Sequence, residues 1–241
     1  MPPFPIRSFR VTERRSETFE TFTIVLEPAD GEPIFAFKAG QFVMVHLANP
    51  DGTPWAKAAY SIATAPCESM KSFELGIKIH GDFTKRLSEL KEGDTIGIQG
   101  PYGAFFLKED ADRIVFFAGG VGVTPLRSMI REALLCKKPM ELVLFYSEKN
   151  RSAMAYEREF RELAAAHSTF RFIPILTRES PEDWDGETCR LDRAMTERLL
   201  TDWTRGRYAV CGPDAFMDCV KTMLMDAGVD VATRFQKESF G

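Results

Sequence analysis

The sequence has few of the residues that bind metal ions. Its 241 residues include five cysteines and three histidines. The cysteines lack the close spacings that ligate zinc or an iron–sulfur cluster, so we expect reduced, mostly buried thiols and no metal site. We expect the histidines to be structural or solvated. The cysteines are Cys67, Cys136, Cys189, Cys211 and Cys219, and the histidines are His46, His80 and His167.

Long apolar runs and an excess of positive charge are also absent. No uninterrupted apolar run approaches the roughly 18 residues that a membrane span needs. Lysine and arginine number 31 against 35 acidic residues, and this net charge of -4 argues against a nucleic-acid-binding surface. The stretch from Met1 to Arg7 lacks the basic region and apolar core of a signal peptide. We therefore expect a cytoplasmic protein with no membrane span and no nucleic-acid partner.

The pattern of the chain changes near residue 108. Before it, short β-type runs separated by turn residues suit an antiparallel barrel or sandwich. These runs cover 21–26, 41–47, 59–63, 72–79 and 94–99, and one helical segment covers 83–90. After it, apolar strands alternate with helices, which predicts a parallel sheet covered on both faces. The strands are expected at 114–118, 141–146, 170–176 and 208–211, and the helices at 125–135, 153–166, 190–200 and 215–226. We expect two domains, 1–108 and 109–241.

A glycine-rich turn follows the apolar strand over 114–118. It contains Gly119, Gly120 and Gly122, with Thr124 and Pro125 at the expected helix entrance. Glycine lets backbone N–H groups approach an anion, and the helix dipole favours negative charge there, so the turn is a candidate phosphate site. The threonine hydroxyl is suited to cap the helix. On the residues alone, the turn can equally serve only to reverse the chain.

Two further strands are expected to end at the same edge of the sheet as the strand before this turn. Thr177 follows one apolar strand, and Cys211 ends another immediately before Gly212 and Pro213. Ligands of parallel sheets bind beyond the carboxyl ends of the strands. The sequence therefore predicts a nucleotide site at this edge of the sheet.

Six motifs, in this order, resemble the ferredoxin–NADP reductase family of flavoproteins over nearly the whole chain. They are Tyr60-Ser61, Gly81-Asp-Phe-Thr-Lys-Arg-Leu87, Gly100-Pro-Tyr-Gly103, the glycine turn over 119–122, Cys211-Gly-Pro213 and Glu238-Ser-Phe-Gly241. The resemblance implies an N-terminal antiparallel Greek-key β-barrel that holds flavin and a C-terminal α/β parallel-sheet domain that binds NAD(P). It also implies that the C-terminal tail returns to the flavin.

The resemblance places the flavin, expected as FAD with FMN as an alternative, on the first domain. It implies that Tyr60 lies against the isoalloxazine ring and Ser61 near its reactive N5 atom. The loop from Gly81 to Thr84 would hold the pyrophosphate with a hydroxyl and helix N-terminal amides, although a threonine cap of a short helix is also consistent with it.

One residue departs from the family pattern. The R-x-Y-S signature has arginine two positions before the tyrosine, where this chain has Ala58. Lys57 is adjacent, but strand alternation turns it away from Tyr60. Lys85 and Arg86 are the candidate substitutes for the missing charge.

The resemblance also assigns roles in the second domain. Gly119, Gly120, Gly122 and Thr124 would hold the coenzyme diphosphate. Cys211, with Gly212 and Pro213, would lie beside the nicotinamide, and Glu238 and Phe240 would approach the flavin ring. Thr177 and Arg178 match a serine–arginine pair that binds the 2′-phosphate of NADPH, which favours NADPH slightly over NADH.

The activity implied is transfer of a hydride from NAD(P)H to flavin, followed by electron transfer to an acceptor. Ser61, Cys211 and Glu238 are the candidate catalytic residues. No C-x₄-C-x₂-C run is present, so the acceptor is expected outside the chain: a ferredoxin, a flavodoxin or an oxygenase component. The alternatives are a reductase of free flavins, quinones or ferric chelates, and a non-catalytic flavin-holding subunit of a larger complex.

Overall fold

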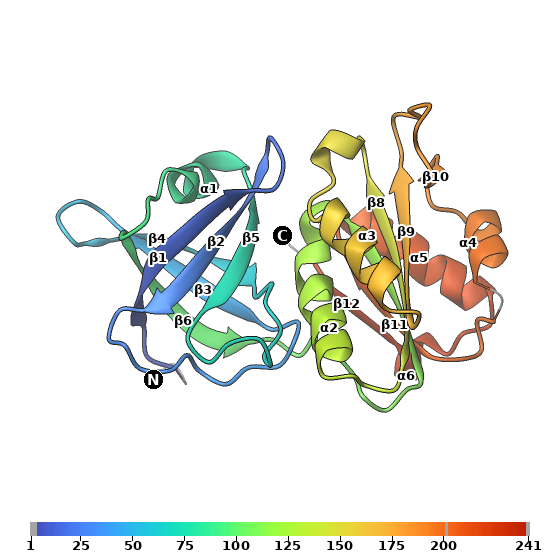
Figure 1. Ribbon diagram of the computed structural model, residues 1–241, viewed down its shortest axis with the longest axis horizontal. Helices are drawn as coiled ribbons and strands as arrows, with labels where there is room; N and C mark the ends of the chain where they lie inside the picture. Colours follow the sequence, from blue (N-terminus) through green and yellow to red (C-terminus); the bar gives the residue numbers. More distant parts are fainter. Residues whose placement is uncertain (1–3, 201, 240–241) are drawn as a thin grey trace. The chain divides into compact units, whose positions relative to one another are not determined.

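A computed structural model of the chain describes residues 4–200 and 202–239 (Figure 1). The contacts between Cα atoms divide it into two units. The first contains residues 1–107 together with 127–136, and the second contains 108–126 and 137–241. Helix α2 (Val123–Leu135) is therefore shared, because its last turns group with the first unit.

The first unit is a six-stranded antiparallel sheet in the order β4-β3-β6-β1-β2-β5. An isolated antiparallel bridge between Ile62 and Leu75 joins the two ends of this order and closes the barrel. The described elements are β1 (Arg7–Ser16), β2 (Thr21–Pro28), β3 (Phe42–Ala48), β4 (Pro54–Ser61), β5 (Phe73–Lys78), α1 (Gly81–Ser88) and β6 (Thr95–Tyr102). Its fully buried core includes Phe9, Phe22, Ile24, Val43 and Leu75.

The second unit is a parallel six-stranded sheet in the order β10-β9-β8-β7-β11-β12. The strands are β7 (Arg113–Gly119), β8 (Glu141–Glu148), β9 (Phe170–Leu176), β10 (Glu187–Thr188), β11 (Arg207–Cys211) and β12 (Phe235–Glu238). The helices are α3 (Glu157–Ala166), α4 (Arg193–Leu199), α5 (Asp214–Asp226) and α6 (Val231–Arg234), with 3₁₀ turns η1 (Gly120–Gly122) and η2 (Arg151–Ala153).

Helices cover both faces of this parallel sheet. Every residue of β7 is buried, as expected for a central strand without a solvent face. Phe117 and Phe145 pack into one core with residues of α4 and α5, whereas Tyr146 meets Phe160 of α3 on the opposite face. Figure 1 shows α3 and α5 on opposite sides of the sheet.

The structure corrects several details of the predicted elements. Strands β1, β10 and β12 and helix α6 were not predicted. The helix expected over 153–166 starts only at Glu157, because residues 151–153 form η2 and Tyr156 has a left-handed backbone with φ of 61°. The expectation of mostly buried thiols was wrong: Cys67, Cys136, Cys189 and Cys219 are exposed, and only Cys211 of the five is buried.

Candidate cofactor-binding sites

Three aromatic rings form a stack in the first unit. Tyr60 and Phe83 have centroids 6.1 Å apart with an angle of 17° between their planes, and Phe83 and Trp55 are 5.8 Å apart at 6°. Trp55 joins the side of Tyr60 because the β3–β4 register shifts beside it: Leu47 faces Ala56, but Ala48 faces Pro54. The stack offers flat, partly exposed surfaces to a planar ligand, and Trp55 is 39% exposed.

Tyr60 and Ser61 end strand β4, Tyr60 at the half-buried position and Ser61 at a buried one. Burial raises the pKa of Tyr60 to about 12, so its hydroxyl stays protonated and able to donate a hydrogen bond at neutral pH. Ser61 is 3% exposed. These positions fit a flavin ring that lies on the tyrosine and receives polar contact at the strand end.

Helix α1 starts at Gly81, directly beside Phe83 of the stack. Gly81 has φ of 79°, and a side chain there would meet no atom within 4 Å. Thr84 is buried, and its hydroxyl accepts from the His80 N–H at 2.6 Å and donates to the Gly81 carbonyl at 3.1 Å. His80 is the N-cap of α1, so the Thr84 hydroxyl braces the first turn and is not itself the cap. The first-turn N–H groups, which have no acceptor within a helix, remain suited to an anion.

Lys57 and the two candidate substitutes, Lys85 and Arg86, differ in their surroundings. Lys57 faces His46 across the β3–β4 ladder and is exposed, and Lys85 is also exposed. Arg86 lies with its guanidinium carbon 4.7 Å from the centre of the Trp55 ring and donates to the Ala48 carbonyl. Of the three, Arg86 is the one held against the aromatic stack.

The end of strand β4 is fastened by residues 127–131 within the first unit. The Arg127 guanidinium donates to the Ala63 carbonyl at 3.0 Å and to Glu74 at 2.7 Å. Ser128 donates to the Thr64 carbonyl at 2.6 Å. These bonds fix the backbone that follows Ser61, and sequence reasoning missed them because the partners are far apart in the chain.

The second unit brings two turns together at one edge of its sheet. Strand β7 lies beside β11, and the strands that follow β7 in sequence, β8 and β9, lie on its other side. The chain order reverses between β7 and β11, and such a switch point is where parallel sheets bind ligands. The turn over 119–122 and the turn over 211–213 both fall there.

The glycines of these turns serve different purposes. A Cβ atom on Gly122 would lie 2.3 Å from the Cys211 carbonyl oxygen, and one on Gly212 would lie 3.0 Å from the backbone of Gly119. These glycines allow the two turns to pack backbone against backbone. Gly120, with φ of 59°, has only Glu148 near its Cβ position, at 3.5 Å, so it leaves room for a ligand.

Thr124 acts differently from the prediction. Helix α2 begins at Val123, and the buried Thr124 hydroxyl donates to the Val121 carbonyl at 2.9 Å instead of accepting from a helix N–H. It closes the turn. Pro213 is the N-cap of α5, so a helix N-terminus also follows the second turn.

Cys211 and Glu238 lie side by side at this edge, as register partners of β11 and β12. Cys211 is fully buried, and burial together with the charge of Glu238 raises the pKa of the thiol well above its usual value. The thiol is therefore a neutral, small and polarizable group and not a nucleophile. Phe240 lies outside the described residues.

Thr177 and Arg178 follow the end of β9, at the same edge of the sheet. Their N–H groups donate to the carbonyls of Glu148 at 2.9 Å and Lys149 at 3.0 Å. Thr177 is half-buried and Arg178 exposed. Glu148, which sequence reasoning missed, is buried at the end of β8, the second strand of this sheet in sequence. An acidic residue there is a known signal for a ribose hydroxyl partner in dinucleotide-binding sheets.

Comparison with known proteins identifies the two domains. The family model described as an oxidoreductase FAD-binding domain matches residues 8–107, and that described as an oxidoreductase NAD-binding domain matches residues 116–222. The chain belongs to the ferredoxin–NADP reductase-like family of oxidoreductases. Its cofactors are FAD and a nicotinamide dinucleotide.

The chain is similar to curated reductases and to solved structures. It is 33% identical over 218 residues to the glycine betaine monooxygenase reductase subunit of Pseudomonas aeruginosa, covering 88% of this chain and 58% of that protein. It is 33% identical to the phenol hydroxylase P5 protein of Acinetobacter pittii, covering 79% of this chain and 54% of that one. The chain thus spans somewhat more than half the length of these relatives.

Two solved structures share the fold. The FAD/NAD-binding domain of nitric oxide dioxygenase from Vibrio cholerae has a TM-score of 0.87 at 23% identity and covers 98% of both chains. A ferredoxin–NADP⁺ reductase from Neisseria gonorrhoeae with bound FAD and NADP has a TM-score of 0.81 at 19% identity and covers 97% of this chain and 98% of that one. Within the described ranges, none of the helices has the length and hydrophobicity needed to cross a bilayer.

Proposed function

We propose that this protein is a reductase that takes electrons from NADPH or NADH through FAD and delivers them to an acceptor outside the chain. The observation that carries the proposal is the pair of turns, 119–122 and 211–213, packed together at the switch point of a parallel sheet in a chain that also has an FAD-binding domain. When bound, the two cofactors supply the hydride and electron transfer. The acceptor proposed first is an oxygenase component, because similar proteins are named as reductases of monooxygenase systems. A ferredoxin or a flavodoxin is the second choice.

The chain's own residues would position the two cofactors. We propose that Tyr60 supports the flavin ring, that Ser61 makes polar contact with it, and that the first turn of α1 holds the pyrophosphate. In the second unit, the turn over 119–122 would hold the coenzyme diphosphate, and the neutral Cys211 thiol would face the nicotinamide with Glu238 beside it. None of these roles requires a general base.

Anaerobic absorption spectra test the proposal. The purified protein should carry about one FAD per chain. Its flavin absorbance should bleach when NADPH or NADH is added and return when an acceptor is supplied. A flavin that neither coenzyme bleaches would instead favour a non-catalytic flavin-holding subunit. The free-flavin reductase alternative would be favoured if the enzyme reduced free FMN, a quinone or a ferric chelate at the same steady-state rate as it reduces protein acceptors.

Arg86→Ala should weaken FAD binding by about tenfold, because one charge-assisted hydrogen bond to a phosphate is lost. The position of Arg86 against Trp55 motivates this expectation. Fluorescence titration of flavin-free protein with FAD measures the change. Lys85→Ala tests the other candidate for the same phosphate contact. Lys91→Ala, which removes an exposed lysine from the loop after α1, is the control. A larger loss for Lys85→Ala would assign the charge to that residue.

Arg178→Ala should raise KM for NADPH about tenfold and leave KM for NADH nearly unchanged, because only NADPH carries a 2′-phosphate. Steady-state kinetics with both coenzymes decide this. The matched control is Arg171→Ala, which removes an exposed arginine from β9, the strand that ends two residues before Arg178. If both coenzymes respond equally, Arg178 does not discriminate. An enzyme that already prefers NADH would point to Glu148, whose carboxylate repels a 2′-phosphate.

A further inference from the structure

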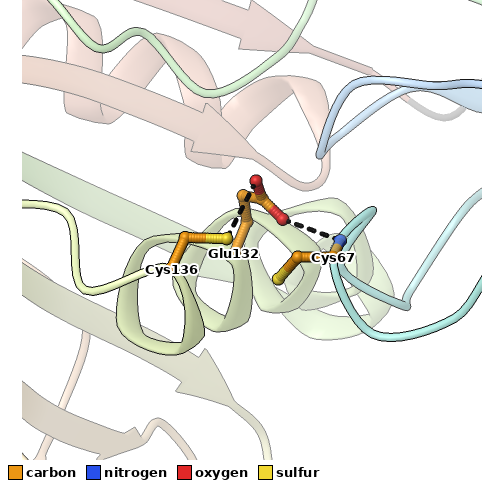
Figure 2. Close-up of side chains that lie close together, drawn as sticks. All are labelled: Cys67, Glu132 and Cys136. Carbon is orange, nitrogen blue, oxygen red and sulfur yellow. Dashed lines mark hydrogen bonds between the residues drawn. The ribbon is translucent and has the colours of Figure 1, made fainter.

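Among the described residues, one group of side chains has the composition of a metal site: Cys67, Glu132 and Cys136. All three belong to the first unit. Figure 2 shows Glu132 on α2 and Cys136 directly after the end of that helix, with Cys67 reaching toward them from a loop. The thiols are exposed and the carboxylate is half-buried.

The geometry of the group suits a tetrahedral ion. The three ligand atoms lie within 4.8 Å of one another, and the Cys136 Sγ atom is 3.5 Å from Glu132 Oε1. Zinc bonds of about 2.3 Å to sulfur and about 2.0 Å to oxygen imply ligand separations of roughly 3.5 to 3.8 Å in a tetrahedron. The side chains therefore need to move by no more than about 1 Å to surround an ion.

The backbone on both sides of the group is already fixed. Glu68, the neighbour of Cys67, accepts from Arg131, the neighbour of Glu132, with an Nε to Oε2 distance of 2.9 Å. The Cys67 N–H also donates to Glu132 Oε2 at 3.1 Å. The loop and the helix are thus held in place without an ion. Ion binding would therefore lose little conformational entropy in ordering the ligands.

We propose that Cys67, Glu132 and Cys136 form a binding site for a thiophilic divalent cation, of which Zn²⁺ is the best match. Two thiolates select a soft or borderline ion over Mg²⁺ or Ca²⁺, and the carboxylate completes a three-ligand set with one position left for water. Zn²⁺ binds as the two thiols each lose a proton to solvent, which leaves a site of net charge -1. This site shares no residue with the proposed FAD and NAD(P) sites, and its occupant would hold residues 63–68 against α2.

Calorimetric titration of the reduced, FAD-loaded protein with zinc chloride tests the proposal. We expect one Zn²⁺ to bind per chain and about two protons to be released, the latter measured by repeating the titration in buffers of different ionisation enthalpy. Bound zinc should also protect two thiols from reaction with a thiol reagent. Cys67→Ser and Cys136→Ser should each weaken binding by about a hundredfold, and Glu132→Gln by about tenfold, since each removes one ligand. Cys219→Ser, an exposed cysteine on α5, should bind as the unaltered protein does.

Three results would overturn the proposal. One is the absence of stoichiometric binding when zinc is in excess over the protein. Another is binding that survives in the Cys67→Ser/Cys136→Ser double variant. The third is a protein in which Cys67 and Cys136 oxidise readily to a disulfide, whereas the reduced form does not bind zinc. The variants' unfolding temperatures establish that each remains folded.

Discussion

Gly122→Ala is expected to lower the free energy of unfolding by about 3 kcal/mol and to slow flavin reduction by NAD(P)H about a hundredfold. The added methyl group would lie 2.3 Å from the Cys211 carbonyl oxygen and 2.5 Å from its carbonyl carbon. Both contacts are with backbone, so no side chain can rotate away. The two turns must separate, and the groups they present to the coenzyme move with them.

Urea unfolding and stopped-flow bleaching of the flavin measure the two effects of Gly122→Ala. Gly31→Ala is the matched control, because Gly31 has φ of 77° and no atom within 4 Å of its Cβ position. It should cost only the backbone strain, about 1 to 2 kcal/mol, and leave the reduction rate unchanged. Wild-type reduction kinetics in Gly122→Ala would show that the turns do not act as one unit.

Arg127→Ala is expected to destabilise the protein by about 3 kcal/mol, because it leaves a largely buried carboxylate short of a partner. The side chains of Arg127 and Glu74 are only 6% and 18% exposed, and their nitrogen and oxygen atoms are 2.7 Å apart. The substitution also removes the bond to the Ala63 carbonyl. Arg15 remains as a second partner of Glu74, which limits the loss.

The loss in Arg127→Ala should depend on pH. Burial raises the pKa of Glu74, but the charges of Arg127 and Arg15 and their hydrogen bonds outweigh it, so the pKa is lowered. A lowered carboxyl pKa contributes stability above the unfolded value of about 4.3, and this contribution is lost as pH falls through the folded value. The difference between wild type and variant should therefore shrink below about pH 4.

Urea unfolding across this pH range checks the dependence. Arg158→Ala is the control, since Arg158 forms an ion pair with Glu162 on the surface of α3 and is 91% exposed. It should change stability by less than about 0.5 kcal/mol at any pH. A loss in Arg127→Ala that is constant from pH 7 to below pH 4 would mean that packing, not the ion pair with Glu74, accounts for it.

Hydrophobic patterning predicted the two kinds of sheet but not every strand. The central strands of the second unit are continuous apolar runs, so β7, β8, β9 and β11 were found within two residues at each end. Strand β1 was missed because five of its ten residues are charged and a bulge between Val11 and Glu13 interrupts the alternation. Strand β12 is short and polar and gains its structure only by pairing with β11.

The sequence located the turns of the candidate site, but their mutual arrangement depends on tertiary contacts. Spacing identified Gly122 as part of a glycine-rich turn, whereas its packing against Cys211 is visible only when β7 and β11 lie side by side. Cysteine is often buried, which misled the expectation for Cys219. The buried positions of α5 are Met217, Val220, Met223 and Leu224, and Cys219 falls on the other face. Cys67 and Cys136 meet only through the fold.

The backbone contact between the turns at 119–122 and 211–213 also limits how coenzyme preference can be engineered. If the first turn is replaced by the corresponding segment of a relative, the new backbone conformation is adapted to that relative's own second turn. Because a single methyl group on Gly122 already meets the Cys211 backbone, a mismatch has no space to relax. Chimeras should exchange both segments together, and in a library the two should vary as linked positions.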